Sequence, residues 1–186
     1  MDNGADNYSR FRDKGDIQGL DEIIREFKDG LILYLMSIAG NIETAEELAE
    51  DTFVLIGTKK PKFKGKSSFR TWLYAIARNL TIDYMRKNSK HMTVPIDENT
   101  DISDDALSLE SAYIIKEDKM TLHRAMRKLS PDHQQVLWLV YFEEMSNKEA
   151  AAVMGKSVRG LESILYRARK SLRSQLETEG FNYEKL

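Results

Sequence analysis

The stretch SNKEAAAVMGKSVRGLESILYRARKSL, residues 146–172, decides how the C-terminal part of the chain folds. Ser146 and Glu149 have the spacing of a capping box, which predicts the start of a short helix. Gly155 predicts a turn after that helix. The apolar residues that follow recur at helical spacing and predict a second, longer helix: Leu161, Ile164, Leu165, Ala168 and Leu172. A short helix, a tight turn and a longer helix are the layout of a helix-turn-helix.

The longer helix of this pair is basic on the face away from its apolar stripe. Residues 156–173 contain six basic residues and one acidic residue, a net charge of +5. A helix of this kind fits the major groove, where arginine can recognise guanine while lysine and serine hold phosphates. Two helices packed in an ordinary bundle are the alternative, but the charge favours duplex DNA. The predicted contacts are Ser157, Arg159, Glu162, Ser163, Tyr166, Arg167 and Lys170.

A second basic segment lies upstream, at residues 57–90, with ten basic residues, one acidic residue and a net charge of +9. A lysine-rich loop there leads into a helix in which aromatic residues alternate with arginines. Cations hold phosphates and aromatic faces stack on unpaired bases, so the segment predicts a site for single-stranded nucleic acid. Phe69 and Trp72 lie on the apolar stripe and are expected in the core. Tyr74 is expected on the polar face, as the stacking candidate.

Helical periodicity extends over most of the chain, and strand-like alternation is absent, so the predicted fold class is all-α. We expect a helix over 21–39 that is interrupted at Gly30, and a further helix that Thr44 and Glu47 open with a capping box. The others are expected to start at Ser67 or Ser68, near Lys116, at Ser130-Pro131, at Ser146 and at Val158.

Residues 91–113 lack helical periodicity and contain six acidic residues but no lysine or arginine. They predict a flexible acidic linker between two small helical domains. The expected division is a first domain over 1–90, the linker over 91–113, a second domain over 114–178 and a tail over 179–186.

The chain has 186 residues, and its 28 basic and 30 acidic side chains give a net charge of −2. That sum conceals the two basic segments, because residues 16–56 carry a net charge of −8 and the linker −6. The absence of cysteine excludes disulfides and thiolate sites and suits a reducing cytoplasm. No signal peptide and no membrane-spanning stretch is visible, so we expect a cytoplasmic protein without direct membrane insertion.

No set of residues with the spacing of a catalytic, metal or phosphate-loop site is visible. The three histidines lie in different segments. We therefore expect no enzymatic activity, no cofactor, no metal and no small-molecule substrate.

Four segments of the sequence resemble the sigma-70 family of RNA polymerase sigma factors. GNIETAEELAEDTF (residues 40–53) and FKGKSSFRTWLYAIARNLTIDYMRK (residues 63–87) are similar to conserved region 2. LSPDHQQVLWLVYFEEMSNKEAAAVMGKS (residues 129–157) and LYRARKSL (residues 165–172) are similar to region 4. The two-domain form without regions 1.1 and 3 resembles the extracytoplasmic-function (ECF) subgroup.

The resemblance implies a specificity subunit that binds core RNA polymerase at its clamp helices and flap, recognises the −35 and −10 promoter elements and promotes strand opening. Region 4 would bind the −35 duplex through the helix-turn-helix, and the acidic linker would extend toward the RNA exit path. An anti-sigma factor is a further partner implied by the family. The residues implied in polymerase binding are Glu47, Glu50, Asp51 and Val54. Those implied in binding the melted −10 strand are Lys64, Lys66, Ser67, Arg70, Tyr74, Arg78, Asn79 and Arg86.

The sequence departs from the family pattern in both DNA-binding helices. Many relatives have a pair of tryptophans where this chain has Trp72-Leu73, which implies that fewer promoters are opened. Glu162 lies in the −35 helix, where it can accept a hydrogen bond from cytosine but repels phosphate. Two alternatives stay open: a stand-alone helix-turn-helix regulator of duplex operators, and an interaction protein, such as an anti-activator, that never contacts DNA.

Overall fold

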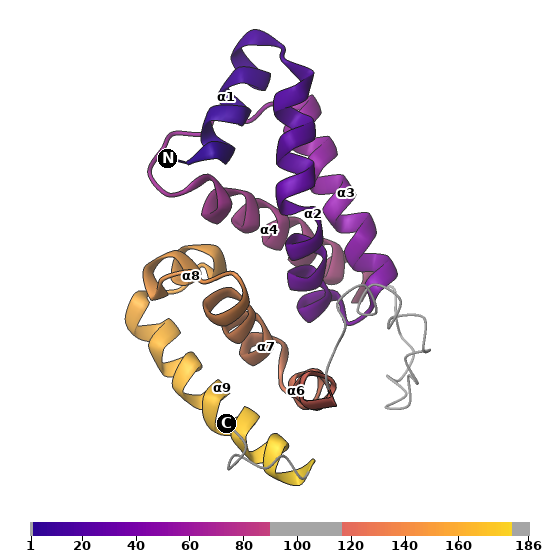
Figure 1. Ribbon diagram of the computed structural model, residues 1–186, viewed down its shortest axis with the longest axis vertical. Helices are drawn as coiled ribbons and strands as arrows, with labels where there is room; N and C mark the ends of the chain where they lie inside the picture. The colour runs from indigo at the N-terminus through magenta and orange to yellow at the C-terminus, as the bar shows by residue number, and fades with distance from the viewer. Residues whose placement is uncertain (1, 90–116, 180–186) are drawn as a thin grey trace.

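The structure, a computed structural model, describes residues 2–89 and 117–179 (Figure 1). The elements in these ranges are α1 (Asn3–Lys14), α2 (Ile17–Ala39), α3 (Ile42–Thr58), α4 (Phe69–Ser89), α6 (Glu117–Arg127), α7 (Pro131–Leu137), η2 (Trp138–Phe142), α8 (Asn147–Met154) and α9 (Val158–Thr178). All of them are helical, and η2 is a turn of π-helix that continues α7. The all-α prediction is confirmed. The predicted linker and residues 180–186 of the predicted tail lie outside the described residues, and the predicted domain boundaries stay a prediction.

The first half of the molecule, residues 2–89, is built around α2, which packs against α1, α3 and α4. An aromatic cluster joins α1 to the start of α4, where the rings of Tyr8, Phe63, Phe69 and Trp72 lie 5.1–5.7 Å apart between centroids. Phe69 is fully buried, as expected for a core residue. The cluster fixes the lysine-rich loop at 59–68 against α1, because Phe63 belongs to that loop.

Helix α2 runs without a break through Gly30, so the predicted interruption is wrong. The residues around this glycine hold the helix in place, since Phe27, Leu31 and Ile32 are all buried. Burial of such side chains outweighs the roughly 1 kcal/mol by which glycine disfavours a helix. A β-carbon on Gly30 would lie 2.7 Å from Glu143 Oε1 and 2.8 Å from the Tyr74 hydroxyl oxygen, so these side-chain ends would have to shift.

The predicted start of α3 at Thr44 is also wrong. Gly40 ends α2 with a left-handed backbone, φ 82°, and Asn41 directly after it is the N-cap of α3. The Asn41 side-chain oxygen accepts a hydrogen bond from the Thr44 amide at 2.8 Å. Asparagine caps a helix at least as well as threonine does, so the earlier residue starts the helix and Thr44 lies in its first turn.

The second half, residues 117–179, is a helix-turn-helix supported by α6 and α7. The Ser146–Glu149 capping box is confirmed in both directions, and Gly155 ends α8 with φ 62°. Ser130 and Pro131 begin α7 as predicted, although the Ser130 side chain makes no capping hydrogen bond. Helix α9 packs its apolar stripe against α6, α7 and α8.

The two halves pack against each other, with α8 on α4 and α7 on α2 (Figure 1). The buried apolar side chains of both halves form one continuous cluster. Within residues 2–89 and 117–179, no helix is both long enough and apolar enough to cross a membrane.

Candidate nucleic-acid interface

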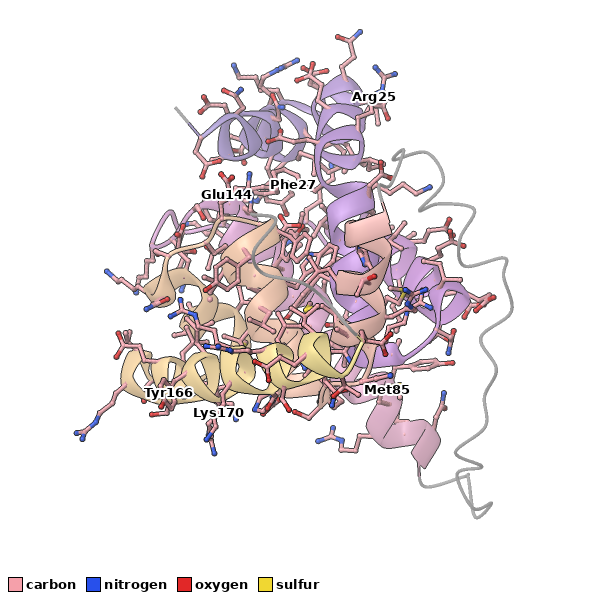
Figure 2. The ribbon with its side chains drawn as sticks, turned by 60° about the horizontal axis from the view of Figure 1, so that its bottom comes forward. Arg25, Phe27, Met85, Glu144, Tyr166 and Lys170 are labelled. Atoms are coloured by element: carbon pink, nitrogen blue, oxygen red, sulfur yellow. The ribbon has the colours of Figure 1, made fainter. Side chains whose placement is uncertain are left out.

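The outer face of α9 carries the side chains predicted to bind duplex DNA. All seven are exposed: Ser157, Arg159, Glu162, Ser163, Tyr166, Arg167 and Lys170. Tyr166 has 71% of its surface exposed, and Figure 2 shows Tyr166 and Lys170 pointing away from the body of the molecule. The face can therefore enter a major groove without rearrangement of its own helix.

Short hydrogen-bonded contacts order this face before any ligand binds. Ser157 is the N-cap of α9 and accepts a hydrogen bond from the Gly160 amide at 3.1 Å. Arg167 Nε donates to the Ser163 carbonyl oxygen at 3.2 Å, and the Ser163 hydroxyl donates to the Arg159 carbonyl oxygen at 3.0 Å. The Nε contact of Arg167 therefore leaves its two terminal nitrogens outside this hydrogen bond.

The lysine-rich loop before α4 forms the second basic surface. Lys64, Lys66 and Ser67 are exposed on it. The loop is fastened to α1, since the Tyr8 hydroxyl donates to the Pro61 carbonyl oxygen at 2.7 Å. Burial raises the pKa of Tyr8 to about 12, so this hydroxyl keeps its proton at neutral pH. The exposed cations therefore project from a loop with a defined position.

Further along α4, Asn79 and Arg86 are exposed, as their predicted role requires. Arg86 pairs with Asp83 at 2.9 Å, one turn away on the same helix. Arg70 and Arg78 are half-buried instead, and their side chains contact the second half of the molecule.

The prediction that Tyr74 lies on an exposed polar face is wrong. Its side chain is only 1% exposed, and its ring lies 5.4 Å from that of Tyr34 on α2. Burial, together with the nearby Glu143 carboxylate, raises the pKa of Tyr74 well above its ordinary value. Periodicity placed Tyr74 opposite the core of the first half, but the second half covers that side of α4 as well. Tyr74 is therefore no stacking platform in this structure.

Four side chains predicted to bind polymerase form one exposed stripe on α3: Glu47, Glu50, Asp51 and Val54. Their spacing of three or four residues puts them on the same side of the helix. Val54 is 59% exposed amid three carboxylates. The negative charge disfavours DNA here, and an accessible apolar side chain within it suits a protein partner.

An apolar groove of about 580 Å³ runs along the second half. Helices α6, α7 and α9 form it together with η2, and its lining includes Leu122, Met126, Leu137, Leu172 and Leu176. Two aromatic side chains at this groove, Tyr141 and Phe142, are partly exposed.

Two residues that matter for the interface were not found from the sequence. Asp2 and Tyr8, at the N-terminus, hold the lysine-rich loop and the first turn of α4. Helical spacing of Tyr8 and Phe11 was the available signal for α1. In the ranges that the structure describes, no three His, Asp or Glu side chains are grouped so that they could hold a metal ion.

Comparison with known proteins assigns the two halves. The family model for sigma-70 region 2 matches residues 23–91, and that for sigma-70 region 4 matches residues 119–172. RNA polymerase sigma factor YlaC of Bacillus subtilis is 32% identical over 84% of this chain and 91% of its own length. ECF RNA polymerase sigma factor SigM of the same organism is 30% identical over 89% of this chain and 99% of its own. The chain belongs to the ECF sigma factors of the sigma-70 family.

Solved structures agree with the fold of this sigma factor. CnrH, solved in complex with the cytosolic domain of CnrY, superposes with a TM-score of 0.63 at 24% identity, over 95% of this chain and 96% of CnrH. The sigma factor RpoE, solved in complex with the anti-sigma factor NepR from Bartonella quintana, superposes with a TM-score of 0.62 at 21% identity over 84% of this chain and 96% of its own.

Proposed function

We propose how this chain divides the work of an ECF sigma factor between its two halves. As a member of that family it is a promoter-recognising sigma factor of RNA polymerase. The second half binds the −35 element as duplex DNA, and the first half binds the −10 element as a melted strand. The observation that carries this division is the exposed basic face of α9, which is separate in sequence from the basic loop and helix at 59–89.

On the −35 side, Arg159, Arg167 and Lys170 contribute cations that can hold phosphates or guanine edges. Glu162 lies among them and is suited to accept a hydrogen bond from a cytosine amino group. The −35 sequence preferred by this chain therefore includes a cytosine opposite that carboxylate.

On the −10 side, Lys64, Lys66 and Ser67 hold the backbone of the melted strand, while Asn79 supports a base flipped from the stack. Arg86 lies further along the same helix. Arg70 and Arg78 complete the set once they are released from the second half.

Core polymerase binds the acidic stripe of α3 through its clamp helices. The charge of Glu47, Glu50 and Asp51 steers the encounter, and Val54 adds apolar contact. The flap binds the second half, where the apolar groove is the available surface. We further propose that the chain catalyses no reaction itself, acts in the cytoplasm and is held inactive by an anti-sigma factor.

The test is reconstitution of core RNA polymerase with this chain on a library of promoter fragments. We expect co-purification with core and initiation from a subset that shares two short elements. A stand-alone helix-turn-helix regulator would instead bind duplex fragments tightly without core. Failure to associate with core, together with tight binding to duplex DNA alone, would contradict the proposed function.

A further inference from the structure

We propose that residues 180–186, with the sequence GFNYEKL, turn back at the end of α9 and cover the apolar groove of the second half. Phe181 and Tyr183 are the side chains that fill it. The cover can be tested on the free protein, without polymerase or promoter. Its effect on the flap rests on the proposed function, in which the flap binds this groove.

The groove exposes apolar surface that another segment can bury. Its lining comes from α6, α7, η2 and α9, and two aromatic side chains in it, Tyr141 and Phe142, are 51% and 42% exposed. Contiguous apolar surface of this kind marks a site where something else packs. Its volume of about 580 Å³ lies within the roughly 300–1,000 Å³ of pockets that enclose a small molecule, so it has room for aromatic side chains.

The end of α9 is fastened to α6, which forms one wall of the groove. Glu179 is the C-cap of α9, and its carboxylate pairs with Lys128, directly after α6, and with Arg124 on α6 at 3.7 Å. The hydrogen bond from Lys128 is the main reason that the pKa of Glu179 is lowered, so the carboxylate stays charged at neutral pH. The chain therefore leaves α9 beside the groove rather than away from it.

An earlier helix of the same half shows how a glycine reverses the chain. Helix α8 ends at Gly155, whose backbone is left-handed with φ 62°. The amide of the next residue, Lys156, donates to the carbonyl oxygen of Ala151, five positions earlier, at 2.9 Å. This is the Schellman motif, in which the residue after the glycine often makes an apolar contact with the residue five positions before it.

The sequence after α9 has the same pattern. Gly180 follows the C-cap Glu179, Phe181 is the next residue, and Leu176 lies five positions before Phe181. Leu176 is part of the groove lining. A Schellman turn at Gly180 would therefore place the Phe181 ring against Leu176, at the end of the groove nearest α6.

The length of the segment matches the length of the groove along α9. From Leu176 back to Arg169, the lining residue nearest the start of the helix, α9 rises by about 10 Å. An extended chain advances about 3.3 Å per residue, so about three residues after Phe181 cover that distance. Side chains alternate along an extended chain, which puts Tyr183 on the same side as Phe181. Both rings can thus enter the groove.

The test uses the fact that the chain contains no cysteine, so one introduced thiol reports on one position. Leu122→Cys places it in the groove wall on α6, and Ser174→Cys places it at an exposed position of α9 outside the lining. Deletion of residues 180–186 should speed alkylation of Leu122→Cys by iodoacetamide about tenfold, the factor for a site that is open about a tenth of the time. Ser174→Cys should react equally fast in both chains. Equal rates for Leu122→Cys would overturn the proposal.

A point variant covers the case in which the shortened chain does not fold. In the full chain that carries Leu122→Cys, Phe181→Ala should speed alkylation about fivefold, because it removes the larger part of the buried apolar surface. Asn182→Ala is the matched control, since in an extended chain its side chain points away from the groove. The same rate in the two variants would overturn the proposal.

Dilution distinguishes this segment from a second copy of the chain as the cover. Protection of Leu122→Cys by residues 180–186 should not depend on protein concentration, because the cover belongs to the same molecule. Protection that is lost on dilution would show that another copy fills the groove, and would overturn the proposal.

The effect on the flap is measured by titration of fluorescently labelled core polymerase. If residues 180–186 and the flap compete for the groove, their deletion should tighten association with core by about threefold. Should alkylation behave as expected while binding to core stays unchanged, the covered groove stands and the assignment of the flap to it fails.

Discussion

The side-chain carboxylate of Asp2 accepts a hydrogen bond from the backbone amide of Phe69 at 2.7 Å, although 67 positions separate the two residues. The other oxygen of the same carboxylate accepts from the Ala5 amide at 3.3 Å. One side chain therefore caps α1 and also holds the first amide of α4, the helix assigned to the −10 strand.

Asp2→Ala should lower the free energy of unfolding by about 1–2 kcal/mol, the usual effect of removing a helix cap. Asp6→Ala is the matched control, because it removes the same charge from the first turn of α1 but leaves both of these hydrogen bonds in place. It should cost about 0.5 kcal/mol. Urea unfolding of the three proteins measures the difference, and equal losses in both variants would contradict the capping of α4 by Asp2.

Tyr8→Phe should release the lysine-rich loop from α1, at a cost of about 1 kcal/mol for the lost hydrogen bond to Pro61. Hydrogen exchange at residues 59–68 should become faster in the variant, whereas exchange in α9 should not change. An unaltered loop would show that the aromatic cluster alone positions it.

The same tyrosine makes stability sensitive to alkali. Its pKa is raised from 10.0 to about 12, chiefly by burial, so the protonated hydroxyl is favoured by folding. The contribution of Tyr8 is then fully present below pH 10 and is lost as the pH rises toward 12. The stability advantage of the parent over Tyr8→Phe should therefore shrink and then reverse across that interval, because a shift of about two pKa units outweighs the lost hydrogen bond. The difference between their phenolate absorbance titrations should have its midpoint near pH 12.

Val54→Ala should weaken association with core polymerase by about tenfold, the loss expected for an apolar anchor at a protein interface. Because Val54 is 59% exposed, the free energy of unfolding of the variant should differ little from that of the parent. Ile17→Ala, at a position 63% exposed on α2, is the control for loss of an exposed apolar side chain elsewhere. Titration of fluorescently labelled core measures both, and equal weakening by the two variants would argue against a specific docking stripe on α3.

Arg167→Ala should weaken use of the −35 element, since it removes a cation from the outer face of α9, and a lost base or phosphate contact costs about 1–3 kcal/mol. Asn79→Ala should instead leave closed-complex binding intact and slow strand opening. Footprinting of the duplex and permanganate reactivity of the melted strand separate the two steps. If both variants impair duplex binding to the same degree, the two halves do not divide the promoter as proposed.

Local signals predicted the second half well, because a helix-turn-helix is determined by residues close in sequence. The Ser146–Glu149 box, Pro131 and Gly155 act within one helical turn, and the structure contains each of them as expected. One error was local, since Asn41 rather than Thr44 caps α3. The others came from packing over long distances. Tyr74 is covered by Tyr34 and the second half, and burial of the residues around Gly30 keeps α2 unbroken.

Arg70 and Arg78, which were predicted to bind the −10 strand, are half-buried for the same reason. Periodicity along α4 identifies one apolar stripe, but it contains no information about a second body packed on the opposite side. The stripe on α3 is exposed because nothing in the described parts of the chain covers it, and its role in polymerase binding stays a prediction. Helical spacing thus predicts an exposed face correctly where no other element of the chain packs against that face.

The attachment of the lysine-rich loop to α1 has a practical consequence for chimeras between ECF sigma factors. The match to sigma-70 region 2 begins at residue 23, whereas the loop and the start of α4 are held by Asp2 and Tyr8. A graft cut at the boundary of the conserved region would transplant the proposed strand-binding surface without the residues that hold it in place. Exchanges of promoter specificity with this chain should therefore carry residues 2–14 along with the loop they position.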